Sequence, residues 1–319
     1  MVRPFKKDIN FLGHRKIFFI VSGVLILASI FGFVFRGGLS FGIEFMGGSS
    51  IELTNAQNVS IDQVRQAFAA QGQNDVLIQQ ASEPGGGQGY VIRTSQTDAA
   101  AASKTADAVI KALNLPAQTV QPQTIGSSWG GDVTRSMIIA LIVAMALIII
   151  YMAIRYEWKM GLCAIIALIH DIIIVTGFYA IFHIDVTPNV VAAMLTIMGY
   201  SLYDTVVVFH RIKDNTAETR SHSFMTVANH SINQTILRTI NTTVTTLVPV
   251  VAMLIFGGET LQEFALAMTI GLISGSYSSI GIATPIYALW KQHEPKFKKL
   301  RSKFGEGVGS FSAAEDLGE

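Results

Sequence analysis

The chain alternates between long apolar runs and short polar segments, and the apolar runs have the length of membrane spans. A transmembrane helix needs about 17–25 mostly apolar residues. We expect six such helices, at residues 17–35, 137–154, 160–182, 190–209, 235–256 and 264–290. The last run is longer than one span requires. We therefore expect it to be tilted or to break near Pro285, because proline removes a backbone hydrogen bond from a helix.

One polar segment, residues 36–135, carries the patterns of a folded domain. Alternation of apolar and polar residues predicts strands at 49–54, 75–80, 90–94 and 117–125. A helix after the first strand has Ser60 as its N-cap and Gly72 as its stop, and a helix after the third strand has Thr97 or Asp98 as its cap. The order βαββαβ predicts a small α+β domain of the ferredoxin-like type between the first two spans.

The composition agrees with an integral membrane protein. Hydrophobic residues make up 50% of the 319 residues and charged residues 14%, and the mean hydropathy is +0.45. The first apolar run lacks a small-residue cleavage site, so we expect it to stay as an anchor. Cys163 is the only cysteine, which excludes an intramolecular disulfide.

Basic residues gather at alternate ends of the expected spans, and cytoplasmic loops are the ones rich in lysine and arginine. They lie before the first span (Arg3, Lys6, Lys7, Arg15, Lys16), between the second and third (Arg155, Lys159), between the fourth and fifth (Arg211, Lys213, Arg220) and after the sixth (Lys291, Lys296, Lys298, Lys299, Arg301, Lys303). The loops HIDVTPN and GGETLQE contain neither. We expect both termini in the cytoplasm and the domain of residues 36–135 on the outer side.

These patterns divide the chain into five parts. We expect a cytoplasmic N-terminus (1–16), a first transmembrane helix (17–35), an external domain (36–135), a five-helix transmembrane domain (136–290) and a basic, disordered cytoplasmic tail (291–319). GSSWGGD, just before the second span, is expected to be a linker, and the terminal GEGVGSFSAAEDLGE is expected to be disordered.

No motif for enzymatic chemistry is present in the sequence. The glycine-rich PGGGQG leads into a strand and does not match GxxxxGK[ST], and HExxH, CxxC and GxSxG are absent. We therefore expect neither an enzyme nor a bound cofactor or metal. Energy for any work would come from a partner or from an ion gradient.

His170 and Asp171 lie deep in the third expected span. Asp171 is twelve residues from Lys159, which is about 18 Å at the rise of a helix and close to the bilayer midplane. A charge there opposes insertion by ~2.5–3.5 kcal/mol, so such residues usually face a partner or a wet interior. The alternative is a structural contact between helices with no proton exchange.

Asp204 and Arg238 lie on consecutive spans of opposite direction, at similar expected depth. Asp204 is seven residues from Arg211, about 10 Å along a helix, and Arg238 lies about one turn inside the same face. Burial favours a protonated carboxyl and a nearby arginine favours the carboxylate, so together they suit Asp204 to exchanging a proton. The alternatives are an Arg238 that reaches the headgroups and an Asp204 that only bonds to the next helix.

The fifth and sixth spans carry small polar residues. Asn241, Thr242 and Thr245 could support a hydrated path beside Asp204. Gly271 and Gly275 have the spacing of close helix contacts, and we interpret the glycines and serines of the sixth span as packing residues.

The order of these segments resembles the SecF family, the smaller subunits of the SecDF protein-export accessory complex in the resistance-nodulation-division superfamily. The resemblance is carried by IRYEW, ALIHD, GYSLYDTVVVFHRIKDN, the LRT and TTL of the fifth span, and FGG, and it extends from the first span to Trp290. It implies half of a transporter of that superfamily, in the inner membrane of a bacterium. It also implies a SecD-type partner, the SecYEG channel, preprotein substrates, and a proton or Na⁺ gradient as the energy source.

The resemblance also implies roles for individual residues. The membrane acid of the GYS block falls on Asp204, the arginine of the RT…TTL span falls on Arg238, and the HD pair falls on His170 and Asp171. Three positions depart from the family pattern. Tyr203 stands where an asparagine is usual, His210 stands within FHR where FDR is usual, and EFMGG at 44–48 replaces DFTGG. We expect Tyr203 and His210 to lie at the membrane interface.

Three other functions are compatible with parts of the pattern. A proton-coupled exporter of small molecules or lipids would need a binding cleft larger than a domain of about 100 residues provides. An intramembrane aspartyl protease would match the YD of Tyr203–Asp204, but LIHD lacks the GxGD context of such enzymes. A passive assembly subunit would use the buried charges for structure alone.

Overall fold

The structure is a computed structural model that describes residues 8–309, apart from residues 36, 55, 57–58, 75, 83–87, 116–121, 219–221 and 306. The chain forms two compact units. One comprises residues 41–140, and the other comprises residues 1–40 together with 141–319.

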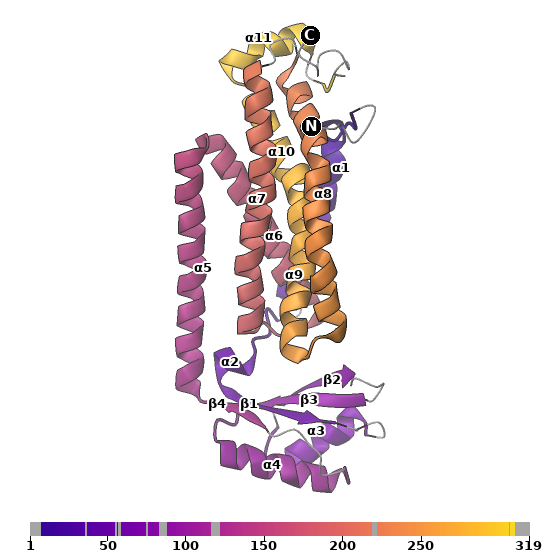
Figure 1. Cartoon of the computed structure of the whole chain (residues 1–319). Helices are drawn as coiled ribbons and strands as arrows, with labels where there is room; N and C mark the ends of the chain where they lie inside the picture. The colour runs from indigo at the N-terminus through magenta and orange to yellow at the C-terminus, as the bar shows by residue number, and fades with distance from the viewer. Residues whose placement is uncertain are drawn as a thin grey trace. The chain divides into compact units, whose positions relative to one another are not determined.

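The described part of the chain contains six helical segments that are long and apolar enough to cross a membrane, as the sequence predicts. They are α1 (Arg15–Phe35), α5 (Ser127–Arg155), α6 (Trp158–Phe182), α7 (Pro188–Glu218), α8 (Phe224–Phe256), and α9 (Glu259–Ser278) continued by a π-helical segment and α10 (Thr284–Lys291). Figure 1 shows α6, α7, α8 and α9 running alongside one another. The fold is therefore a polytopic helical membrane protein.

The buried part of this bundle is formed by three of the spans. In the most apolar windows of α6, α7 and the α9–α10 span, 44%, 56% and 61% of residues are buried, against 17%, 6% and 11% for α1, α5 and α8. The buried polar groups of α6, α7 and α9 are consequently withdrawn from lipid, whereas α1, α5 and α8 expose most of the residues in these windows.

The sixth span is helical through Pro285, so the break that we allowed for near this residue is absent. Residues Ser279–Ala283 form a π-helical segment just before the proline, and the Thr284 hydroxyl donates to the Ser279 carbonyl at 2.8 Å. A π-bulge accommodates the proline locally, because it rearranges the carbonyls that would otherwise lack a donor.

Small residues set the close approach of the spans. A Cβ at Gly271 would lie 2.2 Å from the Ile197 Cδ1 atom, and one at Gly275 would lie 2.9 Å from the Ser201 Cβ atom. The expected close contact through these two glycines is confirmed, and the neighbouring helix is α7. Gly177 plays the same part between α6 and α1, since a Cβ there would lie 2.8 Å from the Ser29 Cα atom.

Gly177→Ala is expected to lower the free energy of unfolding by about 1–3 kcal/mol, because the added methyl group collides with the Ser29 Cβ and Cα atoms, which cannot move without the helix, as well as with the Ser29 hydroxyl. Gly199→Ala is the matched control: it is also within a helix, but nothing lies within 4 Å of its Cβ position. Thermal unfolding of the detergent-purified variants measures the difference. Equal stability of the two variants would contradict close packing of α1 on α6.

The unit of residues 41–140 has the predicted order βαββαβ, preceded by a short helix α2 (Ile43–Met46). Its elements are β1 (Gly48–Leu53), α3 (Ile61–Ala70), β2 (Leu77–Ser82), β3 (Gln88–Thr94), α4 (Ala99–Ala112) and β4 (Gln123–Ile125). The strands form one antiparallel sheet in the order β2-β3-β1-β4, with Ile51 opposite Ile92. Both residues are fully buried in a core shared with Val64 and Phe68 of α3 and Val109 of α4.

The structure shows which residues cap the two helices of this unit. Ser60 caps α3 in a capping box with Gln63, and Asp98 rather than Thr97 caps α4 by accepting from the Ala101 amide at 2.7 Å. The expected fourth strand at 117–125 is described only from residue 122, because 116–121 lie outside the described residues.

The linker prediction for GSSWGGD is wrong, since α5 begins at Ser127 and runs without interruption into the second span. Tertiary contact explains the helix despite its glycines. A Cβ at Gly130 would lie 2.6 Å from the Phe45 carbonyl oxygen, so glycine permits a backbone contact with α2 there.

Two segments outside the expected spans of the membrane unit are helical. α8 begins at Phe224, well before residue 235, because the side chain of Asn233 binds the Ile9 amide at 2.8 Å and that of Asn229 binds the Leu12 amide at 3.1 Å. Within the tail expected to be disordered, Pro295–Phe304 forms α11. Residues 310–319 of that tail lie outside the described residues.

Candidate functional site

Asp171 is the centre of a buried polar cluster between α6, α7 and α9. Its side chain is 1% exposed, and its carboxylate accepts hydrogen bonds from Ser201 of α7 at 2.6 Å, Ser274 of α9 at 2.7 Å and Ser278 of α9 at 2.8 Å. The His170 Nδ1 atom lies 3.1 Å from the same carboxylate. Three hydroxyl donors and an imidazole satisfy the oxygens of an acid that is out of contact with solvent.

His170 extends this cluster to the first span. Its Nε2 atom lies 3.1 Å from the Ser22 hydroxyl of α1, which lies 3.0 Å from the hydroxyl of Tyr277 on α9. Tyr277 donates to the Phe18 carbonyl at 2.6 Å. The cluster around His170 and Asp171 therefore joins four helices, α1, α6, α7 and α9.

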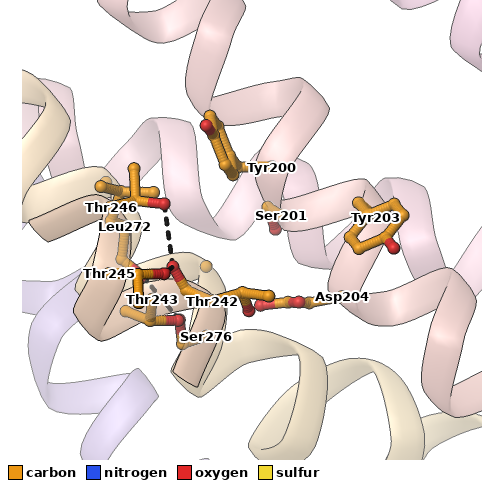
Figure 2. A pocket seen from close by; sticks show the side chains of 12 residues that line it. Tyr200, Ser201, Tyr203, Asp204, Thr242, Thr243, Thr245, Thr246, Leu272 and Ser276 are labelled. Carbon is orange, nitrogen blue, oxygen red and sulfur yellow. Dashed lines mark hydrogen bonds between the residues drawn. The ribbon is translucent and has the colours of Figure 1, made fainter. Parts of the chain in front are cut away.

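Asp204 lies at a cavity of about 140 Å³ between α7, α8 and α9. Its side chain is 8% exposed, and Figure 2 shows it pointing toward Thr242 across the cavity. Ser201 and Ser276 also line the cavity. The space is large enough for several water molecules, since one water needs about 10–15 Å³ of such volume.

Ser201 connects the two acids. It lines the Asp204 cavity, and its hydroxyl donates to Asp171. One turn further along α7, the Thr205 hydroxyl lies 2.9 Å from that of Ser279. A single hydroxyl therefore separates the cavity from the buried carboxylate of Asp171.

The expected pair of Arg238 with Asp204 forms no ion pair within 4.0 Å among the described residues. The Arg238 guanidinium donates instead to the hydroxyl of Tyr203, the residue before Asp204, and lies 5.4 Å from the centre of the Tyr203 ring. Arg238 remains near enough for its charge to act on Asp204. The replacement of the usual asparagine by Tyr203 gives the arginine this nearer acceptor, so Tyr203 is not simply an interfacial residue.

The polar residues of α8 divide between the cavity and the surface. Thr242 and Thr245 line the cavity, whereas Asn241 is exposed. The hydroxyls of Thr242 and Thr245 donate to carbonyls of their own helix, as hydroxyls in apolar surroundings commonly do. Arg238 and Thr245 are also exposed in this chain.

His210 of α7 lies on the surface, with its Nε2 atom 3.6 Å from Asp214.

Several serines are site residues that the sequence reasoning missed: Ser201 of α7, Ser22 of α1 and two serines of α9. Ser274 and Ser278 were interpreted as packing residues, yet both donate to Asp171. Their spacing of four residues places them on one face of a helix, and that face includes the small Gly271 and Gly275. Small residues bring α9 close enough for short hydroxyl side chains to reach the acid.

Metal coordination has little basis at this site. In the part of the chain that the structure describes, no group of three or more His, Cys, Asp or Glu residues is arranged to hold a metal ion. The chemistry that the site offers is hydrogen bonding and protonation of two acids, with hydroxyls and one imidazole as intermediates.

Comparison with known proteins gives a consistent result. Residues 105–293 match the family model described as "Protein export membrane protein SecD/SecF, C-terminal". Protein translocase subunit SecF of Streptomyces coelicolor is 36% identical over 97% of this chain and 85% of its own length. The SecF subunit of Calditerrivibrio nitroreducens is 37% identical over 89% of this chain and 94% of its own length.

A solved structure shares the architecture. The crystal structure of SecDF from Thermus thermophilus, a translocon-associated membrane protein, superposes with a TM-score of 0.82 at 29% identity. The match covers 90% of this chain and 39% of that one.

The six spans, the inserted α+β unit and the buried acids define a membrane protein of the SecD/SecF class. Within this class, the chain belongs to the SecF family.

Proposed function

We propose that the chain is an accessory subunit of the Sec protein-translocation machinery and that it uses a transmembrane proton gradient to promote protein export. The observation that carries the proposal is the cavity at Asp204, which has room for several water molecules and whose wall residue Ser201 also donates to the buried Asp171. A proton could pass between these acids through one hydroxyl and the waters that the cavity admits. One charge that crosses 100 mV releases ~2.3 kcal/mol, enough to bias a conformational change.

The exposed polar face of α8 supports a partner in the membrane. Arg238, Asn241 and Thr245 are exposed in this chain although they lie in a span, and polar groups at such depth usually face protein or water. The SecDF protein of Thermus thermophilus is more than twice as long as the matched region, so a second half can be joined to a SecF-like half in one chain. We infer a SecD-type partner here, with the SecYEG channel and preproteins as the further components.

The basic flanks support one orientation in the bacterial cell membrane. Lysine and arginine cluster at the ends of the spans that adjoin both termini. The termini then face the cytoplasm, and the unit of residues 41–140 lies on the outer side.

An exporter of drugs or lipids is less well supported. Sites for such ligands usually enclose about 300–1,000 Å³, and the cavity at Asp204 encloses about 140 Å³. A proton or a small cation suits that volume better.

The test is to reconstitute the chain with its SecD-type partner and the Sec channel in proteoliposomes and to measure preprotein export. Export should rise under a proton gradient and lose the increment when a protonophore is added. A Na⁺ gradient at equal potential is the control. Stimulation by Na⁺ that resists the protonophore would make Na⁺ the coupling ion, and no response to either gradient would refute the proposal.

A further inference from the structure

A second cavity lies at the end of the spans near both termini, and it shares no lining residue with the cavity at Asp204. It encloses about 200 Å³ and is lined by three lysines, Lys213 of α7, Lys291 of α10 and Lys296 of α11. Glu157, just before α6, is the acidic residue of the lining. Nothing in the proposed proton route uses this cavity.

The charge around the cavity is positive after its ion pairs are counted. Lys291 binds Glu157 at 2.5 Å and Glu294 at 3.2 Å, and Lys159 binds Glu294 at 2.8 Å. Glu157 and Glu294 therefore balance two of the four lysines, which are the three of the lining and Lys159. Lys213 and Lys296 contribute the remaining positive charges, and both are exposed.

Glu294 is an ionised partner of the lysines. Burial alone would raise the pKa of the Glu294 carboxyl, but the hydrogen bonds from Lys159 and Lys291 outweigh burial and hold that pKa below its usual range. An arriving anion would consequently meet Lys213 and Lys296 without having to displace an existing ion pair.

Apart from Thr216, the rest of the lining is apolar or aromatic. Met160, Phe224, Tyr287 and Phe297 line the cavity beside the lysines. The Phe224 and Phe297 ring centres are 4.9 Å apart, and the Lys291 and Lys296 ammonium groups lie 5.9 and 5.7 Å from the Phe297 ring centre. A ligand that fits this lining has an anionic end and an apolar end.

The cavity lies beside residues that are typical of the membrane interface, where lipid headgroups are found. Trp158, at the start of α6, and Trp290, near the end of α10, stack edge to face at 4.9 Å, and the Lys159 ammonium lies over both rings. Tryptophans with adjacent lysines mark the interface between acyl chains and headgroups. α11 adds a basic helix at this level, with Phe297 packed inward and Lys298 and Lys303 outside the cavity lining.

We propose that this cavity binds the phosphodiester headgroup of an anionic phospholipid, held by Lys213 and Lys296. Basic pockets between membrane helices bind acidic headgroups in this way. The apolar residues of the lining would then contact the glycerol backbone and the first carbons of the acyl chains. The bound lipid would link α7, α10 and α11, and the inference does not depend on the proton role of Asp204.

The experiment is a titration of the full-length detergent-purified chain with dioleoyl-phosphatidylglycerol, followed by native mass spectrometry of the first bound lipid. Lys213→Gln/Lys296→Gln should weaken that binding about fivefold for each lysine removed, the effect of one basic residue close to an anionic lipid. Lys298→Gln/Lys303→Gln is the matched control, because it removes the same charge from residues outside the cavity lining, and its effect should stay below twofold of wild type, or roughly 0.4 kcal/mol. Equal melting temperatures without lipid would establish that both double variants fold.

Two further arms distinguish the source of the anion. Dioleoyl-phosphatidylcholine should bind more weakly than phosphatidylglycerol by at least the loss seen in the cavity variant, and millimolar inorganic phosphate should not displace phosphatidylglycerol. Displacement by phosphate would assign the cavity to a free anion and overturn the lipid proposal. Equal weakening by the two double variants would also overturn it, since binding would then reflect only the general charge of this face.

Discussion

Asp204→Asn is expected to abolish the gradient-dependent part of preprotein export while leaving membrane insertion and partner binding unchanged. Asparagine has nearly the same shape and keeps a carbonyl toward Thr242, but it cannot take up or release a proton. Because Asp204 is buried at the cavity rather than directed into lipid, the substitution should affect exchange with water in that cavity. We expect at least a tenfold loss of stimulation, equivalent to about 1.4 kcal/mol or more in coupling. Export by reconstituted vesicles, with and without the proton gradient, measures it.

The matched control is Asp214→Asn on the same helix. Asp214 is also an aspartate of α7, but its side chain is 41% exposed and its neighbour is the surface residue His210. This variant should retain the full gradient response. Normal stimulation of Asp204→Asn would exclude Asp204 as the exchanging acid, and loss in both variants would point to a general effect of charge on α7.

The sequence predicts the spans well because the length and apolarity of a run are local properties. The order βαββαβ is likewise predictable, since alternation and caps such as Ser60 are written into short stretches. GSSWGGD was misjudged for the opposite reason: its helix depends on the contact of Gly130 with the Phe45 backbone, which no local pattern encodes.

The site shows the same division between local and tertiary information. The four ionisable residues stand out because each interrupts an apolar run, and the structure surrounds Asp171 with hydroxyl donors from two other helices. The partner of Arg238 depends on the rotation of α8 against α7, and this rotation presents the Tyr203 hydroxyl instead of the Asp204 carboxylate. The serines around Asp171 were missed because a serine in a span fits close packing as well as it fits hydrogen bonding.

Asp171→Leu is expected to destabilise the membrane unit by about 2–4 kcal/mol. Leucine fills a similar volume, but it leaves Ser201, Ser274 and Ser278 without their common acceptor in an apolar interior. Hydrogen bonds between membrane helices average about 0.6 kcal/mol and reach about 1.7 kcal/mol, and bonds to an acid lie toward the upper end. The loss is smaller than the sum of four such bonds, because removing the acid also removes the cost of burying it. Unfolding of the purified variant in mixed micelles measures the effect.

Asp171→Asn separates the structural role of this acid from any role in proton exchange. The amide keeps one oxygen as an acceptor and the same shape, so the unfolding free energy should fall by less than about 1.5 kcal/mol. If the Leu and Asn variants are equally stable, the cluster does not hold α6, α7 and α9 together. If the Asn variant is stable but loses the gradient response, as Asp204→Asn is expected to do, then both acids lie on the proton route that Ser201 joins. A stable Asn variant with a full response would restrict proton exchange to the cavity at Asp204 and leave Asp171 as the anchor of the helices around it.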